Sequence, residues 1–276
     1  MRGWLMLEKF GLPYTTHMIG LYSGTMARDM QPLTPARLVP ALRLPDGTVV
    51  GESLAMAETL AERHPDAGLW PQDAAARATA RWLCAEMVAG FHALRSACPM
   101  QLKHRWKGFE PSGETRADLT RIETLWAHAR KISGTETGPL FGSYSLADVF
   151  YTPLAARIIG YGLPVSAQNH DYCMELLSDP AVRQWRAMGL TVDYDPFPYD
   201  QPLDAEPWPI GAASTARAVE AGPSVNDLCP YSGKPVTAFL ELDGNRWGFC
   251  NTFCRDKTVA DPGAWPKFTQ MIRQAV

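Results

Sequence analysis

Three cysteines near the C-terminal end of the chain have the spacing of a metal site. Cys229, Cys250 and Cys254 follow the pattern C-x20-C-x3-C. Cys229 begins a Cys-Pro-x-x-Gly turn, which is the shape of a zinc knuckle, and Cys250 and Cys254 lie one helical turn apart. Because their thiolates can face one point, the spacing predicts a zinc site.

The fourth ligand of this zinc site stays open. Zinc in structural sites takes four ligands, and Ser232 stands where a knuckle would carry its second cysteine. Asp227, Asp256 and water are the candidates, and the alternative is a metal-free module with small buried cysteines. The segment resembles the treble-clef modules of YHS type in proteins that traffic or sense heavy metals.

A second group of residues could bind an anionic ligand. Glu52 and Ser53 stand at the start of an amphipathic helix predicted over residues 53–63. Helix N-termini bind anions through free N–H groups and the helix dipole, so Ser53 is predicted to cap this helix or to hold a carboxylate. Upstream, a cis peptide bond between Val39 and Pro40 would turn the backbone N–H and C=O groups of Val39 outward.

These segments resemble the thioredoxin-like domain of glutathione transferases. The resemblance rests on three segments of the sequence, which are Val39-Pro40-Ala41-Leu42, the Pro45-Asp46-Gly47 hairpin turn and Glu52-Ser53-Leu54-Ala55. It implies that Val39, Glu52 and Ser53 contact glutathione and that Pro40 is the structural cis-proline.

A second signature of the same family lies before an apolar helix. Ser145-x-x-Asp148 forms a predicted capping box, with Tyr144 and Val149 at the staple positions. Glutathione transferases carry this box on the buried helix of their second domain. The box is structural, and with it the resemblance covers about residues 1–190.

The residue that would activate the glutathione thiol is not identified. In the family it is a Ser, Tyr or Cys on a loop after the first strand, whereas Met1 here already lies in the first predicted helix. We expect the coding region to continue upstream of Met1, because two strands would otherwise lack their central partner. Tyr14, Tyr22 and Ser23 are the substitutes within the chain, and nothing in the sequence singles them out.

The resemblance also implies a pocket for a second substrate between the two domains. Arg95 and the segment PMQLKHRWKGF bring cationic and aromatic side chains to this region. Arg95, Lys103, Arg105 and Trp106 are therefore predicted to line an anion-friendly pocket. The alternative is a solvated helix end followed by a loop.

The predicted elements place these residues in an α/β plus all-α architecture. A thioredoxin-like domain over residues 1–68, which lacks its first strand, precedes an all-helical domain over 69–192. A Pro-rich segment over 193–223, either an extended linker or a strap along the preceding domain, then leads to a treble-clef-like module over 224–276. Apolar periodicity predicts helices over 1–10, 53–63, 73–96, 115–132, 146–159, 172–177 and 181–188, a helical turn near 34–38, a strand over 14–19, and hairpins at 41–50 and 240–249.

Composition excludes several classes of protein. The 276 residues carry a formal net charge of −3, which argues against a general nucleic-acid binder. Neither a signal peptide nor a membrane helix is apparent, and six cysteines are too few for a disulfide-stapled secreted fold. The expected location is the reducing cytoplasm.

The resulting functional prediction is a glutathione transferase-like protein. It would bind glutathione and activate its thiol toward an electrophilic small molecule, and the family implies a homodimer. It would be an enzyme if the catalytic loop lies upstream of Met1. The alternative is a non-catalytic binding protein that keeps the fold as a scaffold and uses the C-terminal module for a metal or a partner.

Overall fold

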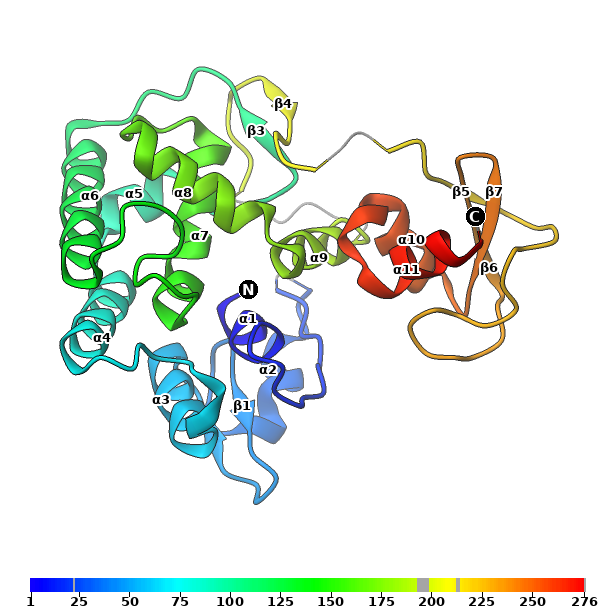
Figure 1. The fold of residues 1–276 in the computed structure, drawn as a ribbon, viewed down its shortest axis with the longest axis horizontal. Helices are drawn as coiled ribbons and strands as arrows, with labels where there is room; N and C mark the ends of the chain where they lie inside the picture. Colours follow the sequence, from blue (N-terminus) through cyan, green and yellow to red (C-terminus); the bar gives the residue numbers. More distant parts are fainter. Residues whose placement is uncertain (22, 193–198, 212–213, 276) are drawn as a thin grey trace. The chain divides into compact units, whose positions relative to one another are not determined.

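The computed structural model describes residues 1–21, 23–192, 199–211 and 214–275, and Figure 1 shows its helices and strands. The chain divides into two compact units. The first comprises Met1–Leu177 with Asp195–Pro207, and the second comprises Ser178–Tyr194 with Trp208–Val276. Within the described ranges, no helix is both long and apolar enough to cross a membrane.

The N-terminal part of the first unit combines short helices with one hairpin. Its elements are α1 (Arg2–Glu8), α2 (Met26–Met30), a 3-10 turn (Gln31–Leu33), β1 (Leu42–Arg43), β2 (Val49–Val50), α3 (Ser53–Arg63) and a 3-10 turn (Pro65–Ala67). The antiparallel β1–β2 pair and the bounds of α3 confirm two predictions. The strand predicted over 14–19 is wrong, because that segment has no ladder partner among the described residues. The helical turn expected near 34–38 lies earlier, over 26–33.

The helical part of the first unit surrounds a buried helix. Its helices are α4 (Ala74–Ala89), α5 (His92–Ala97), α6 (Gly113–Ser133), α7 (Leu146–Tyr161) and α8 (Ala167–Ser178). Every residue of α7 except Arg157 is buried, and the helix packs against α1 and α4 (Figure 1). This confirms the prediction of a central apolar helix.

The capping box at the start of α7 is formed as predicted. The backbone N–H and hydroxyl of Ser145 donate to Asp148 at 2.8 and 3.1 Å. Asp148 is fully buried and also accepts hydrogen bonds from the N–H of Leu140 and the hydroxyl of Tyr172. Burial raises the pKa of this carboxyl group despite its donors. The box therefore anchors the loop before α7 and a residue of α8 at one point.

The single helix predicted over 73–96 is wrong, because the chain breaks between α4 and α5. Gly90 ends α4 in an extended conformation, and Phe91 has a φ of 58°, in the left-handed region. A Cβ on residue 90 would lie 2.8 Å from the carbonyl oxygen of Glu86. The break turns Phe91 into the core, where it is 6% exposed.

Part of the Pro-rich strap forms a ladder with the helical part of the first unit. Strand β4 (Ala205–Pro207) pairs antiparallel with β3 (His104–Trp106). An extended strap along the preceding domain was predicted, and this ladder agrees with it over these residues. Residues 193–198 of the predicted strap lie outside the described residues.

The second unit packs helices onto a three-stranded antiparallel sheet of order β5-β6-β7. Its elements are α9 (Pro180–Gly189), β5 (Arg217–Val219), β6 (Ala238–Leu242), β7 (Asn245–Phe249), α10 (Thr252–Ala260), a 3-10 turn (Pro262–Ala264) and α11 (Pro266–Ala275). The predicted hairpin is confirmed, with Asp243 and Gly244 both at positive φ in its turn. Leu240, Trp247, Phe249 and Phe268 form the centre of the core, to which Ala187 of α9 also belongs.

Candidate functional site

One cavity of the first unit gathers residues from both its N-terminal and its helical part. It has a volume of about 580 Å³. Its lining residues are Met1, Arg2, Pro40, Ser53, His92, Arg95, Ser96, Pro99, Met100, Pro153, Arg157 and Tyr199. Three sequence-predicted site residues, Pro40, Ser53 and Arg95, therefore meet at one place.

The N-terminal wall of the cavity is built where α1 meets the cis-proline. The Val39–Pro40 peptide bond is cis, as the resemblance implied. Gly3 of α1 lies so close to Pro40 that a Cβ on residue 3 would be 2.6 Å from the Pro40 Cβ. A residue without a side chain is therefore required at position 3. Val39 is 38% exposed and is not among the lining residues.

The start of α3 supplies the anion-binding feature. Ser53 is buried and is the first residue of the helix, so the prediction that it caps the helix is wrong. The N-cap is Glu52, whose carboxylate accepts from the N–H of Leu54 at 2.7 Å and from the Ser53 hydroxyl at 3.0 Å. Because Ser53 lines the cavity at the first turn of α3, a ligand carboxylate bound there would lie at the N–H groups that begin the helix.

Three arginines give this cavity a positive charge. Arg2, Arg95 and Arg157 are each partly buried, and no described residue lining the cavity is an Asp or Glu. Arg2 donates to the backbone carbonyl of Phe150, Arg95 donates to those of Val88 and Gly90, and Arg157 donates to those of Cys98 and Pro153. Among the described residues, none of the three forms an ion pair.

The electrostatic consequence is visible in the pKa values of two of these groups. Burial, together with repulsion from the neighbouring Arg95, lowers the pKa of both Arg2 and Arg157 to about 10. Both side chains remain charged at neutral pH. Three cations thus share a cavity whose described lining residues include no carboxylate, although the charge of Glu52 acts to raise the pKa of Arg2.

The remaining predicted pocket residues lie on or beside β3 and do not line this cavity. Lys103 is exposed, and Trp106 is buried against His104 with ring centroids 4.2 Å apart. The Arg105 guanidinium lies against the end of α7, within 2.8 Å of where a Cβ on Gly162 would be. Of the four, the structure brings only Arg95 to the cavity.

Sequence reasoning missed Arg2, His92 and Arg157. A detectable signal existed for Arg157, since it is the single charged residue between Val149 and Tyr161 in an otherwise apolar helix. Charged side chains are rarely buried without a partner or a role. For Arg2 and His92 the sequence carries no comparable signal.

The candidate thiol-activating residues are placed away from the cavity. The Tyr14 hydroxyl donates to Glu8 at 2.6 Å, and burial together with this carboxylate raises the pKa of Tyr14. Ser23 donates to the carbonyl oxygen of Gly20 at 2.7 Å. Neither lines the cavity, and Tyr22 lies outside the described residues.

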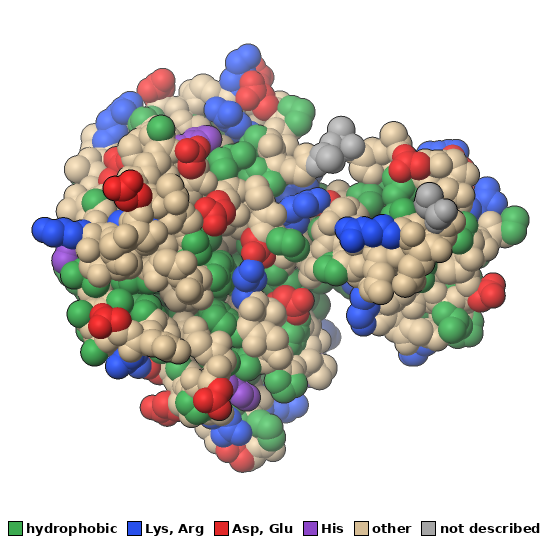
Figure 2. All heavy atoms as spheres, in the orientation of Figure 1, with side chains coloured by type: hydrophobic (Ala, Val, Ile, Leu, Met, Phe, Trp, Pro, Cys, Tyr) green, Lys and Arg blue, Asp and Glu red, His purple; other side chains and the backbone are tan. Residues whose placement is uncertain are grey.

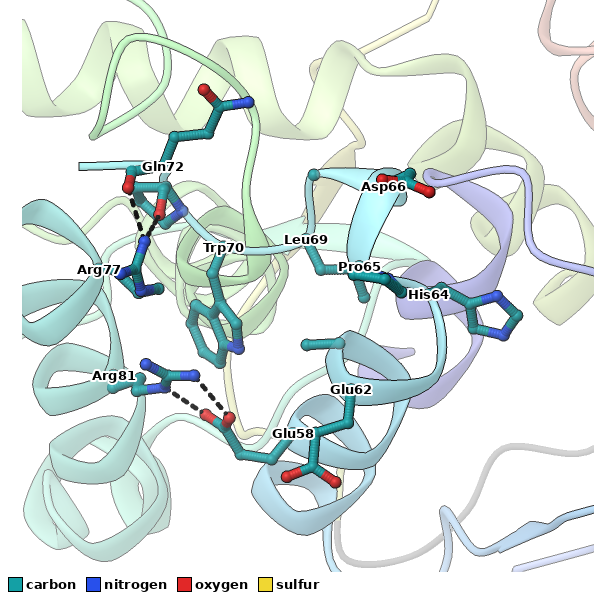
Figure 3. A pocket seen from close by; sticks show the side chains of 13 residues that line it. Glu58, Glu62, His64, Pro65, Asp66, Leu69, Trp70, Gln72, Arg77 and Arg81 are labelled. Atoms are coloured by element: carbon teal, nitrogen blue, oxygen red, sulfur yellow. Dashed lines mark hydrogen bonds and ion pairs between the residues drawn. The ribbon is translucent and has the colours of Figure 1, made fainter. Parts of the chain in front are cut away.

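A second cavity, of about 450 Å³, lies where α3 leads into α4, and Figure 3 shows its lining. The Arg81 guanidinium donates to both oxygens of Glu58 at 2.7 and 2.9 Å, and it lies 5.5 Å from the centre of the Trp70 ring. Arg77 donates to the carbonyl oxygens of Pro71 and Gln72. Arg81 is thus paired with a carboxylate of the same lining, in contrast to the three arginines of the first cavity.

The second unit brings the three predicted metal ligands together. The sulfur atoms of Cys229, Cys250 and Cys254 all lie within 4.8 Å of one another, and those of Cys250 and Cys254 are 3.9 Å apart. Tetrahedral zinc with Zn–S bonds of about 2.3 Å requires sulfur atoms roughly 3.8 Å apart. The donor set therefore fits a thiophilic metal.

The surroundings favour the charged form of Cys229 but not of Cys254, whose pKa is raised to about 12 by burial and by the neighbouring Cys229. Burial opposes ionisation of Cys229, but backbone N–H groups of Cys250, Tyr231 and Ser232 donate to its sulfur and bring its pKa down to about 7. The Ser232 hydroxyl donates to the sulfur of Cys250 at 3.2 Å. No fourth Cys, His, Asp or Glu of the described chain joins the cluster. Asp256, one predicted ligand, is instead paired with Arg255 at 2.7 Å.

The other three cysteines are core residues, as predicted. Cys84, Cys98 and Cys173 are each 0% exposed. Burial raises the pKa of all three thiols. They are therefore unreactive packing residues.

Comparison with known sequences identifies the N-terminal segment. Residues 1–63 match the family model described as glutathione S-transferase, N-terminal domain. The chain is 34% identical over 101 residues to a probable maleylacetoacetate isomerase of Caenorhabditis elegans, covering 37% of this chain and 46% of that protein. It is 37% identical over 70 residues to maleylacetoacetate isomerase of Rattus norvegicus, covering 25% of this chain and 32% of that protein. The chain thus spans less than half the length of the curated relatives it matches.

Solved structures extend the likeness to the fold. A sphingomonad glutathione S-transferase complexed with glutathione aligns with a TM-score of 0.50 at 18% identity, covering 69% of this chain and 94% of that one. A glutathione transferase of Methylococcus capsulatus aligns with a TM-score of 0.51 at 20% identity over the same shares, 69% and 94%. The chain therefore contains the glutathione transferase fold, a thioredoxin-like part followed by a helical part.

Proposed function

We propose that the first unit binds glutathione and presents its thiol to an electrophilic small molecule. The observation that carries this proposal is the meeting of the cis-proline Pro40 and Ser53 at one cavity of about 580 Å³. The match of residues 1–63 to the glutathione S-transferase N-terminal domain and the shared fold support it.

Each residue has a distinct part in the proposed binding. The N–H groups at the start of α3 and the Ser53 hydroxyl hold the γ-glutamyl carboxylate. Glu52, whose carboxylate lies beside Ser53, faces the ammonium group of the same end. The backbone of Val39, before the cis-proline, pairs with the cysteinyl backbone. No residue is assigned to activation of the thiol.

Calorimetric titration of the full chain with S-methylglutathione tests this site. We expect binding, and a loss of about tenfold in affinity on Ser53→Ala, since one hydrogen bond to a charged group is worth ~1.5–3 kcal/mol. Ser112→Ala is the matched control, because Ser112 caps α6 through the N–H of Thr115 and does not line the cavity. Absence of binding by the unmodified chain would refute the proposal.

The cysteine cluster supports a second function, metal binding by the second unit. We propose that Cys229, Cys250 and Cys254 hold zinc or another thiophilic ion, with water as the fourth ligand. The sulfur separations carry this proposal. Elemental analysis of purified protein should give about one metal per chain and none for Cys250→Ser, with Cys173→Ser in the first unit as the control. Substoichiometric metal in the unmodified chain would contradict it.

We further propose that the protein acts as a cytoplasmic homodimer, as the family resemblance implies. Sedimentation equilibrium at micromolar concentration should give twice the chain mass of 30.5 kDa. A single species at the monomer mass would refute the dimer.

A further inference from the structure

The three arginines of the cavity have hydrogen-bonding capacity that the fold leaves unused. A guanidinium group carries five N–H donors. Arg2 donates through Nε only and Arg95 through Nη1 only, while Arg157 uses Nε and Nη1. Each guanidinium therefore keeps at least its Nη2 donors for something else.

The charges of these three guanidinium groups are not paired with a carboxylate of the described chain. Elsewhere in the first unit, Arg81 is paired with Glu58 and Arg121 with Glu86, both at 2.7 Å, whereas Arg77 donates to backbone carbonyls. Arg2, Arg95 and Arg157 have no such partner among the described residues. Their mutual repulsion lowers the pKa values of Arg2 and Arg157. An anion entering the cavity would remove this repulsion and use the remaining donors.

The position of the arginines separates them from the site proposed for glutathione itself. Arg95 lies on α5 and Arg157 on α7, both in the helical part, whereas Pro40 and Ser53 belong to the N-terminal part. The carboxylate at the start of α3 is already provided for by helix N–H groups. The binding proposed above for glutathione uses neither Arg95 nor Arg157, so both are available to the molecule that reacts with the thiol.

From this arrangement we infer that the electrophile accepted by the cavity carries a carboxylate, which Arg95 and Arg157 bind. The inference rests on the proposed glutathione site. Paired N–H groups of a guanidinium match the two oxygens of a planar carboxylate. His92 and Tyr199, the polar side chains lining the same cavity beside them, leave room for a polar rather than a purely apolar molecule.

Two glutathione derivatives of equal size test the inference. S-carboxymethylglutathione carries one more negative charge than S-carbamoylmethylglutathione, and both share the carboxylates of glutathione itself. Calorimetric titration of the full chain should give at least about tenfold tighter binding of the carboxymethyl compound, since a charge-assisted pair of hydrogen bonds is roughly twice as strong as a neutral one.

Variants assign the effect to the arginines. Arg95→Gln should bring the ratio of the two affinities close to one, and Arg157→Lys, which keeps the charge, should reduce it partly. Arg116→Gln is the control and should leave the ratio unchanged, because Arg116 is an exposed residue of α6 that is paired with Glu110. Because Arg95 also contacts carbonyls at the end of α4, retained binding of S-methylglutathione shows that each variant is folded.

The outcomes separate the inference from the function on which it rests. Binding of S-methylglutathione with equal affinity for the two test compounds overturns the acidic electrophile and leaves the glutathione site standing. An affinity ratio that persists unchanged in Arg95→Gln and Arg157→Lys likewise overturns the assignment to these arginines. Failure of S-methylglutathione to bind overturns both proposals.

Discussion

Substitution of Gly3 by alanine would test the contact between α1 and the cis-proline. The added Cβ would lie 2.6 Å from the Pro40 Cβ, 3.1 Å from its Cγ and 3.2 Å from the Met56 Cε. Carbon atoms in contact normally lie about 3.5–4.0 Å apart. The overlap with Pro40 is thus about 1 Å, and a proline ring cannot rotate out of the way.

The expected loss of stability follows from two opposing effects. Overpacking of this kind costs ~1–3 kcal/mol, whereas alanine in place of glycine favours the helix by up to ~1 kcal/mol. We therefore expect Gly3→Ala to lower the free energy of unfolding by about 1–2 kcal/mol. Urea unfolding of the full chain, followed by circular dichroism, measures the change in the transition of the first unit.

A glycine in open space provides the control. Gly113 is the first residue of α6, and a Cβ there meets nothing within 4 Å. Gly113→Ala should therefore leave stability unchanged or raise it by up to ~1 kcal/mol. Equal unfolding free energies for the two variants would refute the reasoning, because the contact with Pro40 would then carry no cost.

Three further predictions concern buried polar groups. Asp148→Ala should lower the free energy of unfolding of the first unit by ~3 kcal/mol in urea, since the donors that converge on this carboxylate lose their acceptor. A decrease in that free energy of less than ~1 kcal/mol would contradict the anchoring role of the capping box. Arg183→Gln should lower the melting temperature of the second unit, because it breaks the ion pair in which Arg183 donates two hydrogen bonds to Asp261, at 2.6 and 2.9 Å. Arg217→Gln is the control and should not lower it, because the pair of Arg217 with Glu241 lies on the exposed sheet edge. In metal-free protein, alkylation of Cys229 should rise with pH through about 7, because its pKa is lowered in the fold; a midpoint near 9 would show that the N–H donors do not stabilise the thiolate.

The lowered pKa of Cys229 also makes the stability of the second unit depend on pH. The folded-state pKa of Cys229, about 7, lies below its usual value of 9.0. Its contribution to the stability of the metal-free second unit is therefore fully present above pH 9 and is lost as the pH falls through about 7. Unfolding free energies of metal-free protein between pH 6 and 9 should increase with pH, and Cys229→Ser should weaken that dependence.

Local sequence signals predicted the elements whose boundaries depend on local chemistry. Residues 53–63 have helical periodicity and stop before Pro65, so α3 was predicted at its observed bounds. The capping box at Ser145 and the turn at Asp243-Gly244 likewise depend on side chains close in the sequence. The resemblance added the cis bond at Pro40, which no propensity specifies.

Elements that depend on distant partners were not predicted. Apolar residues continue at helical spacing through Phe91, so nothing in the pattern marks the break that turns this ring into the core. The segment 14–19 has strand propensity, but a strand needs a neighbour to accept its hydrogen bonds. Arg157 was visible as a lone charge in an apolar helix, yet its meeting with Arg95 and Arg2 is a property of the packed fold alone.

Helix α9 shows why an amphipathic pattern does not decide which core a helix joins. Its apolar stripe is compatible with the end of a helical domain, where the sequence placed it. In the structure it belongs to the second unit. Gln184 donates to the carbonyl oxygen of Ala264 at 2.8 Å, Arg183 pairs with Asp261, and Ala187 is 0% exposed within the core that contains Trp247. The cysteine cluster is part of that same core, so the geometry of a metal site there depends on a helix that ends 28 positions before the first strand of the sheet, at Gly189 against Arg217.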